Sequence, residues 1–176
     1  GAGGGVGTMA VQLAAAAGAD VTGVDNGSKL DTVRSLGADT VLDYEATDFT
    51  EGDTRYELVV DVAGNHPYSA VKRVLAHDGQ YLLIGHDHYG AAGRRYLGSI
   101  PRFLGLLLRA RFDDHLSGMG FSSPDKGEVM AGLAERLAAG TLEPVVDRSY
   151  PLGEVPAALQ HLASGTVCGR LIVTVE

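Results

Sequence analysis

The sequence predicts an α/β fold in which helices cover a doubly wound parallel sheet. Two observations predict this class. Apolar, strand-like runs alternate with helical patterns along most of the chain, as they do in successive βαβ units. The run Leu58–Val62 is almost continuously apolar and β-branched, which is typical of a central strand buried on both faces. The 176 residues are enough to bury one full core, so we expect one main domain with at most a small appendage.

The chain opens with a glycine cluster, Gly1 to Gly7, and continues as an Ala-rich helical run that ends at Gly18. A short β-rich run then ends in Asp25, 18 residues after Gly7. This order, with an acid roughly 20 residues after the glycines, is typical of a Rossmann-type dinucleotide-binding βαβ unit. A flexible glycine linker, the alternative, would not be followed by a long helix and a strand.

Within this cluster, the fingerprint G-x-G-x-x-G falls on residues 2–7, with Ala2 in the first glycine position. We expect the backbone N–H groups of Gly4, Gly5, Val6 and Gly7 to hold a pyrophosphate at the positive end of the following helix. The fingerprint normally follows a buried strand, but no residue precedes Gly1. We therefore expect that the first strand of the fold is missing and that the chain is a piece of a longer protein.

The later elements are expected in a regular order. A helix over 28–36 closes at Gly37 as its C-cap, and a polar loop over 43–56 leads to the strand Leu58–Val62. A helix then begins near Pro67, and a turn at His77–Gly79 precedes a strand. The expected strands are 21–25, 40–42, 58–62, 80–84, 116–121, 142–147 and 170–175, and the later helices are 101–112, 124–138 and 151–164.

Composition limits the functions that this chain can perform. The net charge of −8 argues against a general nucleic-acid or anionic-membrane binder. Cys168 is the only cysteine, so the chain has neither a disulfide framework nor a zinc site built from cysteines. The sequence shows no signal peptide and no apolar run of about 18 residues. We expect a cytoplasmic protein with no membrane segment.

Several motifs, taken together, resemble the medium-chain dehydrogenase/reductase superfamily. They are the glycine run 1–7, the run 35–39 followed by Asp43 and Tyr44, the strand end 61–64, and the tail segments 144–152 and 169–173. The resemblance covers essentially the whole chain and is strongest to the zinc-independent, quinone-oxidoreductase-like branch. It implies a dinucleotide-binding domain over 1–140 and a tail over 141–176 that returns to an absent GroES-like catalytic domain.

The same resemblance implies a function. Such enzymes transfer hydride between NAD(P)H and a quinone, an activated double bond or a carbonyl, and in this branch they use no metal. The catalytic residues stay unknown, because a general acid is expected in the absent domain. The alternative is a nucleotide-binding fragment or module with no catalysis of its own. Expected partners are a small-molecule substrate and a second copy of the chain in a homodimer.

The resemblance also implies further cofactor contacts. Ala63, Ile84 and Gly85 are expected along the track from adenine to nicotinamide, and Phe121 near the carboxamide. Asp61–Gly64 ends a central strand, where ligands of such sheets bind.

The remaining site residues give opposite predictions for the choice between NAD and NADP. Asp25 favours NAD, because a carboxylate accepts hydrogen bonds from the adenosine ribose and repels a 2′-phosphate. Ser28, Lys29 and Tyr44 resemble the positions that hold the NADP phosphate in this branch. Charge repulsion at short range leads us to favour NAD slightly.

Three other patterns have competing interpretations. The pair Tyr68 and Lys72 fits the Tyr-x-x-x-Lys pattern of short-chain dehydrogenases, but it closely follows a strand and no Ser lies about a dozen residues upstream. His86 and His88 could ligate a metal, although a solvated loop, or contact of His86 with substrate, is favoured because no third ligand is evident. Cys168 has no assignable base, which favours an inert, half-buried thiol.

The segment 94–112 is apolar and flanked by arginines. It fits an interfacial membrane helix or a partner surface, and it is too short to span a bilayer. The resemblance favours a substrate lid or a dimer contact here, and it places the strand 80–84 near the subunit interface.

Overall fold

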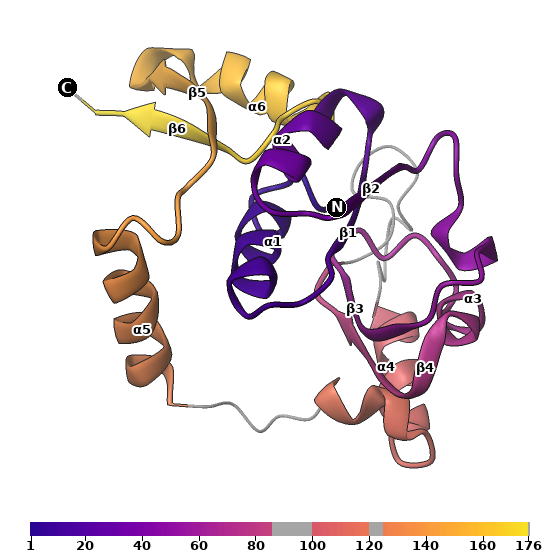
Figure 1. The fold of residues 1–176 in the computed structure, drawn as a ribbon. Coiled ribbons are helices and arrows are strands. Elements are labelled where there is room, and N and C mark those ends of the chain that lie inside the picture. Colours follow the sequence, from indigo (N-terminus) through magenta and orange to yellow (C-terminus); the bar gives the residue numbers. More distant parts are fainter. Residues whose placement is uncertain (86–99, 120–124, 176) are drawn as a thin grey trace. The chain divides into compact units, whose positions relative to one another are not determined.

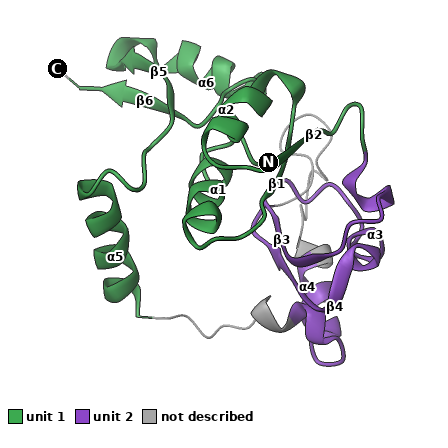
Figure 2. Ribbon diagram, in the orientation of Figure 1, with its two compact units in different colours: residues 1–47, 123–176 green, residues 48–122 purple. Residues whose placement is uncertain are grey.

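The computed structural model describes residues 1–85, 100–119 and 125–175. The chain divides into two compact units, one made of residues 1–47 and 123–176 and the other of residues 48–122 (Figure 2). Helices alternate with strands, and all three strand pairs in the described residues are parallel (Figure 1). The predicted α/β class with parallel pairing is therefore confirmed.

The first unit begins with the glycine-rich loop and helix α1 (Gly7–Ala16). Strand β1 (Thr22–Asp25) pairs in parallel with β2 (Thr40–Asp43), and helix α2 (Leu30–Ser35) connects them after the 3-10 turn η1 (Gly27–Lys29). The core of this part contains Val11, Val33 and Ala38, and Val33 is fully buried. Gly23 has no room for a side chain, because a Cβ atom there would collide with Cγ1 of Val33.

The tail of the chain belongs to the same unit. It contains α5 (Lys126–Ala138), β5 (Val146–Pro151), the 3-10 turn η4 (Leu152–Glu154), α6 (Val155–Ala163) and β6 (Arg170–Thr174), with β5 parallel to β6. Gly169 forms a parallel bridge with Gly4, and the Gly169 N–H group donates to the carbonyl of Gly3 at 2.7 Å. The side-chain amide of Gln12 also exchanges two hydrogen bonds with the backbone of Glu143, at 2.8 and 2.9 Å. The predicted division at residue 140 differs from these unit boundaries and stays a prediction.

The second unit is built on the parallel pair of β3 (Tyr56–Asp61) and β4 (Leu75–Leu83). Around it lie η2 (Phe49–Glu51), α3 (Tyr68–Arg73), α4 (Ile100–Arg109) and η3 (Asp114–Met119). The six side chains of its buried core come from α3, β4, α4 and η3; they are Tyr68, Val71, Leu75, Tyr81, Leu106 and Leu116.

Three expected elements differ from the structure. The turn predicted at His77–Gly79 lies inside β4, where the pairing with β3 shifts register between Tyr56 and Leu58. The strand predicted over 116–121 is wrong for its described part, because residues 114–119 form a 3-10 helix. Its start is fixed locally: the Leu116 N–H group donates to the Asp113 carbonyl at 3.0 Å.

The strand predicted over 142–147 begins only at Val146 and continues to Pro151. The preceding residues close helix α5 instead, since the N–H groups of Thr141 and Leu142 both donate to the carbonyl of Arg136. Leu142 is buried although it lies in this turn and not in a strand.

Candidate dinucleotide-binding site

Backbone hydrogen bonds tie the glycine-rich loop to the end of β1. The Ala2 N–H group donates to the Val24 carbonyl at 3.0 Å, and the Gly3 N–H group donates to Oδ2 of Asp25 at 2.7 Å. Helix α1 follows at once, with Val6 as its N-cap residue. Among the residues that the structure describes, no side chain caps this helix start. The first N–H groups of a helix lack partners within it, so they can bind an anion.

The glycines of the loop differ in the room that their surroundings leave for a side chain. A Cβ atom on Gly3 would lie 2.9 Å from Cβ of Lys29, and one on Gly5 would lie 3.0 Å from Cγ of Arg170. A Cβ atom on Gly7 would collide with the backbone of Gly1 and Ala2. At Gly4, by contrast, the nearest protein atom would be 3.5 Å away, which is ordinary van der Waals contact. The protein's own packing therefore leaves space above the backbone of Gly4.

Asp25 is buried beneath this loop, with 5% of its surface exposed. Its Oδ2 atom accepts from Gly3, and its Oδ1 atom accepts from the Asn26 N–H group at 2.8 Å. The ammonium group of Lys29 lies 3.5 Å from Oδ1. A carboxylate offers about four acceptor positions, so hydrogen bonds from a ribose remain possible. The role predicted for Asp25 toward the ribose stays a prediction.

The three residues expected to favour NADP differ in their exposure to solvent. The Lys29 side chain turns inward, is 7% exposed, and donates from Nζ to the Gly165 carbonyl at 2.8 Å. Ser28 and Tyr44 are exposed. The Tyr44 N–H group donates to the Asp25 carbonyl at 3.2 Å, which places Tyr44 beside the end of β1. Only Ser28 and Tyr44 therefore present their side chains to solvent in this group.

The other predicted contacts lie in the second unit, at the carboxyl ends of β3 and β4. The N–H groups of Ile84 and Gly85 both donate to the Asp61 carbonyl, at 2.9 and 3.4 Å. Ala63 is exposed, and a Cβ atom on Gly85 would collide with the Val62 carbonyl. The structure thus brings Ala63, Ile84 and Gly85 to one strand edge.

The Asp61 side chain accepts two hydrogen bonds at that edge, which the sequence did not predict. Its Oδ1 atom accepts from the Gly64 N–H group at 2.7 Å, and its Oδ2 atom accepts from the Tyr81 hydroxyl at 2.9 Å. Phe121, His86 and His88 lie outside the described residues.

The geometry around Tyr68 does not fit a short-chain dehydrogenase base. The Tyr68 hydroxyl donates to Oδ2 of Asp113 at 2.9 Å, and Lys72 Nζ donates to the same oxygen at 2.6 Å. Burial and the Asp113 carboxylate raise the pKa of Tyr68 far above its usual value, whereas a catalytic base needs a pKa near the working pH. Sequence analysis missed Asp113 because it lies 41 residues beyond Lys72.

Burial acts to raise the pKa of the Asp113 carboxyl, but hydrogen bonds from Lys72 and Tyr68 outweigh it and hold that pKa below its usual range. A cavity of about 360 Å³ adjoins this cluster, lined in part by Lys72, Phe112, Asp113 and His115. The Nδ1 atom of His115 lies 2.6 Å from the Gly79 carbonyl, so η3 is fastened to the bulged part of β4.

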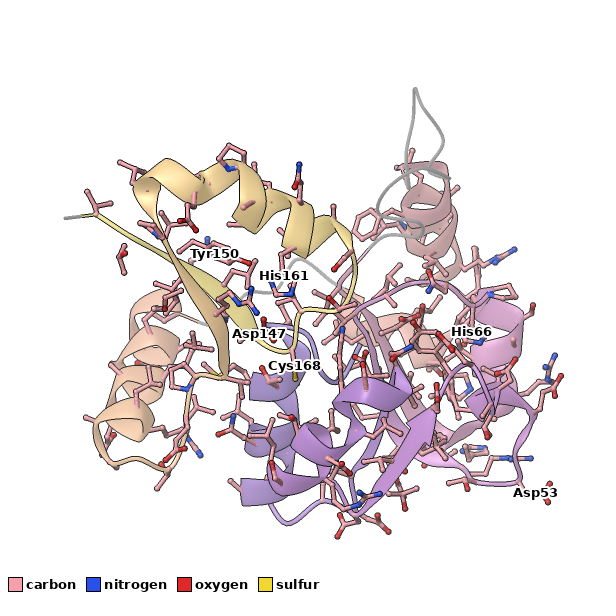
Figure 3. All side chains as sticks on the ribbon, turned by 90° about the horizontal axis from the view of Figure 1, so that it is seen from above. Asp53, His66, Asp147, Tyr150, His161 and Cys168 are labelled. Carbon is pink, nitrogen blue, oxygen red and sulfur yellow. The ribbon has the colours of Figure 1, made fainter. Side chains whose placement is uncertain are left out.

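A second polar cluster lies in the tail, where Asp147 and Tyr150 on β5, His161 on α6 and Cys168 before β6 come together (Figure 3). The Tyr150 hydroxyl lies 3.0 Å from Nδ1 of His161, and Oδ2 of Asp147 lies 3.6 Å from Nε2. The Cys168 N–H group donates to Asp147 at 3.3 Å, and its thiol is partly buried. These contacts join β5, α6 and the start of β6.

The described ranges, 1–85, 100–119 and 125–175, contain no group of three or more His, Cys, Asp or Glu side chains that could hold a metal ion. They also contain no helix long and apolar enough to cross a membrane.

Together, the parallel α/β units and the glycine-rich loop at the start of α1 define a dinucleotide-binding type of fold. The sequence profile of the zinc-binding dehydrogenase family matches residues 36–173. The chain therefore belongs to this family, within the medium-chain dehydrogenase/reductase superfamily.

Named relatives agree with this assignment. The mitochondrial NAD(P)H oxidoreductase RTN4IP1 of Mus musculus is 29% identical, over 99% of this chain and 46% of its own length. The chloroplast envelope quinone oxidoreductase homolog of Arabidopsis thaliana is 28% identical, over 98% of this chain and 50% of its own length. The chain thus spans about half the length of these relatives. Their organelles differ from the expected location, so a cytoplasmic protein stays a prediction.

Solved structures show the same fold. The quinone oxidoreductase from Coxiella burnetii superposes with a TM-score of 0.77 at 20% identity, over 99% of this chain and 51% of that protein. The Escherichia coli quinone oxidoreductase, solved in complex with NADPH, gives a TM-score of 0.71 at 23% identity, over 98% and 54% of the two chains. The described fold is therefore that of the corresponding half of these proteins.

Proposed function

We propose that this chain binds NADPH or NADH through its glycine-rich loop and serves as the cofactor-binding half of an oxidoreductase. Hydride would pass from the nicotinamide to a quinone, an enone or a carbonyl compound, without zinc. The observation that carries the proposal is the open backbone at Gly4 beside an uncapped helix start. Two phosphates of a dinucleotide match such a site, because they need close backbone approach and N–H donors.

The relatives support the same cofactor. RTN4IP1 is named an NAD(P)H oxidoreductase, and the Escherichia coli structure is a complex with NADPH. In the bound state the dinucleotide supplies the hydride. This chain's residues would position it: Gly4 to Gly7 at the pyrophosphate, Asp25 at the adenosine ribose, and Ser28 and Tyr44 at a 2′-phosphate. Ala63, Ile84 and Gly85 would lie along the track to the nicotinamide. Phe121 is proposed near the carboxamide. Positioning of this kind accounts for much of catalysis when no residue forms a covalent bond with the substrate.

The expected preference for NAD is proposed to be small. That preference rests on the charge of Asp25, but Lys29 lies 3.5 Å away and offsets it. We therefore propose that both cofactors bind, with a small difference between their affinities. A homodimer, a small-molecule substrate and a cytoplasmic location belong to the same proposal.

Calorimetric titration of the chain with NADPH and NADH tests the binding step. We expect a sub-millimolar Kd for at least one of them, and a Kd about tenfold weaker for Gly4→Ala, because the new methyl group occupies the space needed by the phosphates. The matched control is Gly132→Ala in α5, where a Cβ atom meets nothing within 4 Å and affinity should not change. Equal affinities of wild type and Gly4→Ala would contradict the loop as the phosphate site.

A second measurement separates the enzyme from the alternative, a binding module with no catalysis. NADPH oxidation is followed with 1,4-benzoquinone as acceptor, with and without a zinc chelator. Turnover that the chelator leaves unchanged supports a zinc-independent oxidoreductase. Cofactor binding without turnover favours the module for this chain.

A further inference from the structure

The side chain of Lys29 joins three segments that are far apart in the sequence. Its ammonium group lies 3.5 Å from Oδ1 of Asp25, at the end of β1, and donates to the carbonyl of Gly165, in the loop between α6 and β6, at 2.8 Å. Its aliphatic stem packs on Gly3, because a Cβ atom there would lie 2.9 Å from both Cβ and Cδ of Lys29. A lysine that is 7% exposed and so placed has little freedom to reach outward to a ligand.

Asp25 links Lys29 to the glycine-rich loop. The same carboxylate that faces Lys29 accepts the Gly3 N–H group at 2.7 Å. Gly3 in turn accepts a hydrogen bond from Gly169 of the tail at 2.7 Å. The loop, the end of β1 and the tail are thus connected around the buried Asp25 carboxylate. Lys29 is the nearer of its two cationic neighbours, at 3.5 Å, and the Gly1 ammonium group lies 3.8 Å from Oδ2.

This ion pair also affects the electrostatics of cofactor choice. An acid at the end of this strand normally disfavours the 2′-phosphate of NADP by repulsion. Here a positive charge lies within ion-pair distance of that acid, so the pair as a whole has no net charge. The repulsion acting on a 2′-phosphate is correspondingly weak.

We propose that Lys29 is a positioning and specificity residue, which holds Asp25 beneath the glycine-rich loop and cancels its repulsion of a 2′-phosphate without touching that phosphate. The inference rests on the proposed function, since it concerns the same cofactor site. It assigns Lys29 a different role from that of a direct phosphate ligand.

A double-mutant cycle on the full chain tests this role. Wild type, Lys29→Met, Asp25→Asn and the double variant are titrated with NADPH and NADH, and the ratio of the two Kd values is compared. With Asp25 present, Lys29→Met should raise the NADPH/NADH ratio about tenfold, because the carboxylate then loses the nearer of its two cationic neighbours and keeps only the Gly1 ammonium group, 3.8 Å from Oδ2. In the Asp25→Asn background, the same substitution should leave the ratio unchanged. Lys29→Arg, which keeps the charge, should restore a ratio near that of wild type.

Other results would overturn the proposal. A direct phosphate ligand predicts that Lys29→Met raises the ratio equally in both backgrounds. A purely structural role predicts that affinity for both cofactors falls equally and the ratio stays constant.

If wild type binds neither cofactor, the proposed function fails, and thermal unfolding of the same four variants tests the ion pair alone. If Lys29 and Asp25 are coupled, Lys29→Met should lower the melting temperature much more when Asp25 is present than in the Asp25→Asn background. Equal shifts in both backgrounds would refute this coupling.

Discussion

The glycines of the loop differ in the space that the folded chain leaves for a side chain. A Cβ atom on Gly7 would collide with backbone, and one on Gly3 or Gly5 would crowd the side chains of Lys29 and Arg170. A Cβ atom on Gly4 would make only ordinary contact, which leaves room for the proposed phosphate site. The sequence predicted the loop and Asp25 from spacing alone, but it could not predict the inward turn of Lys29, which depends on Gly165, 136 residues away.

A stability prediction at this scale concerns Gly23 in β1. Gly23→Ala should lower the free energy of unfolding by about 1–3 kcal/mol, because the new methyl group collides with the fully buried Val33. Urea denaturation measures this change. Gly132→Ala in α5 is the control and should stabilise the chain by about 0.5–1 kcal/mol, since it replaces an unobstructed helical glycine. Equal effects of the two substitutions would contradict the packing described around Gly23.

Helices and strands were predicted well where the hydrophobic pattern of their own residues defines them. They were predicted poorly where their position depends on contacts with residues far away in the sequence. Helix α1 and strand β1 follow from the pattern of their own residues. The 3-10 helix η3 does not, because its place depends on His115 reaching Gly79 and on Asp113 reaching α3. Likewise, Leu142 is apolar and buried, as a strand residue would be, but it lies in the turn that closes α5.

The link between α3 and η3 predicts a dependence of stability on pH. The pKa of Asp113 is lowered from 3.8 in the folded chain, so its contribution is present above that value and is lost as pH falls through the folded pKa. Asp113→Asn should lower the melting temperature at pH 7 and weaken its decline below about pH 4. Melting curves from pH 7 to pH 2.5 measure both effects. Asp114→Asn, at an exposed neighbour, is the control. An unchanged acid response in Asp113→Asn would contradict the role given to this carboxylate.

At the scale of the whole molecule, the chain spans about half the length of the relatives that it matches. The family profile covers residues 36–173, whereas the glycine-rich loop lies before that range. Short motifs spread along the chain, including this loop, predicted both the family and the fold. The hydrogen bonds between Gln12 and Glu143, which join α1 to the tail, could not be predicted from the sequence because 131 residues separate the two partners.

The measurement that tests the central claim most directly is amide hydrogen exchange of the full chain with and without saturating NADPH. We predict slower exchange at residues 4–7, where N–H groups would bind the pyrophosphate. We also predict slower exchange at Gly169 and Arg170, which donate hydrogen bonds to the carbonyls of Gly3 and Gly5 in this loop. Bound NADPH that leaves exchange at residues 4–7 unchanged and slows it elsewhere would contradict the account.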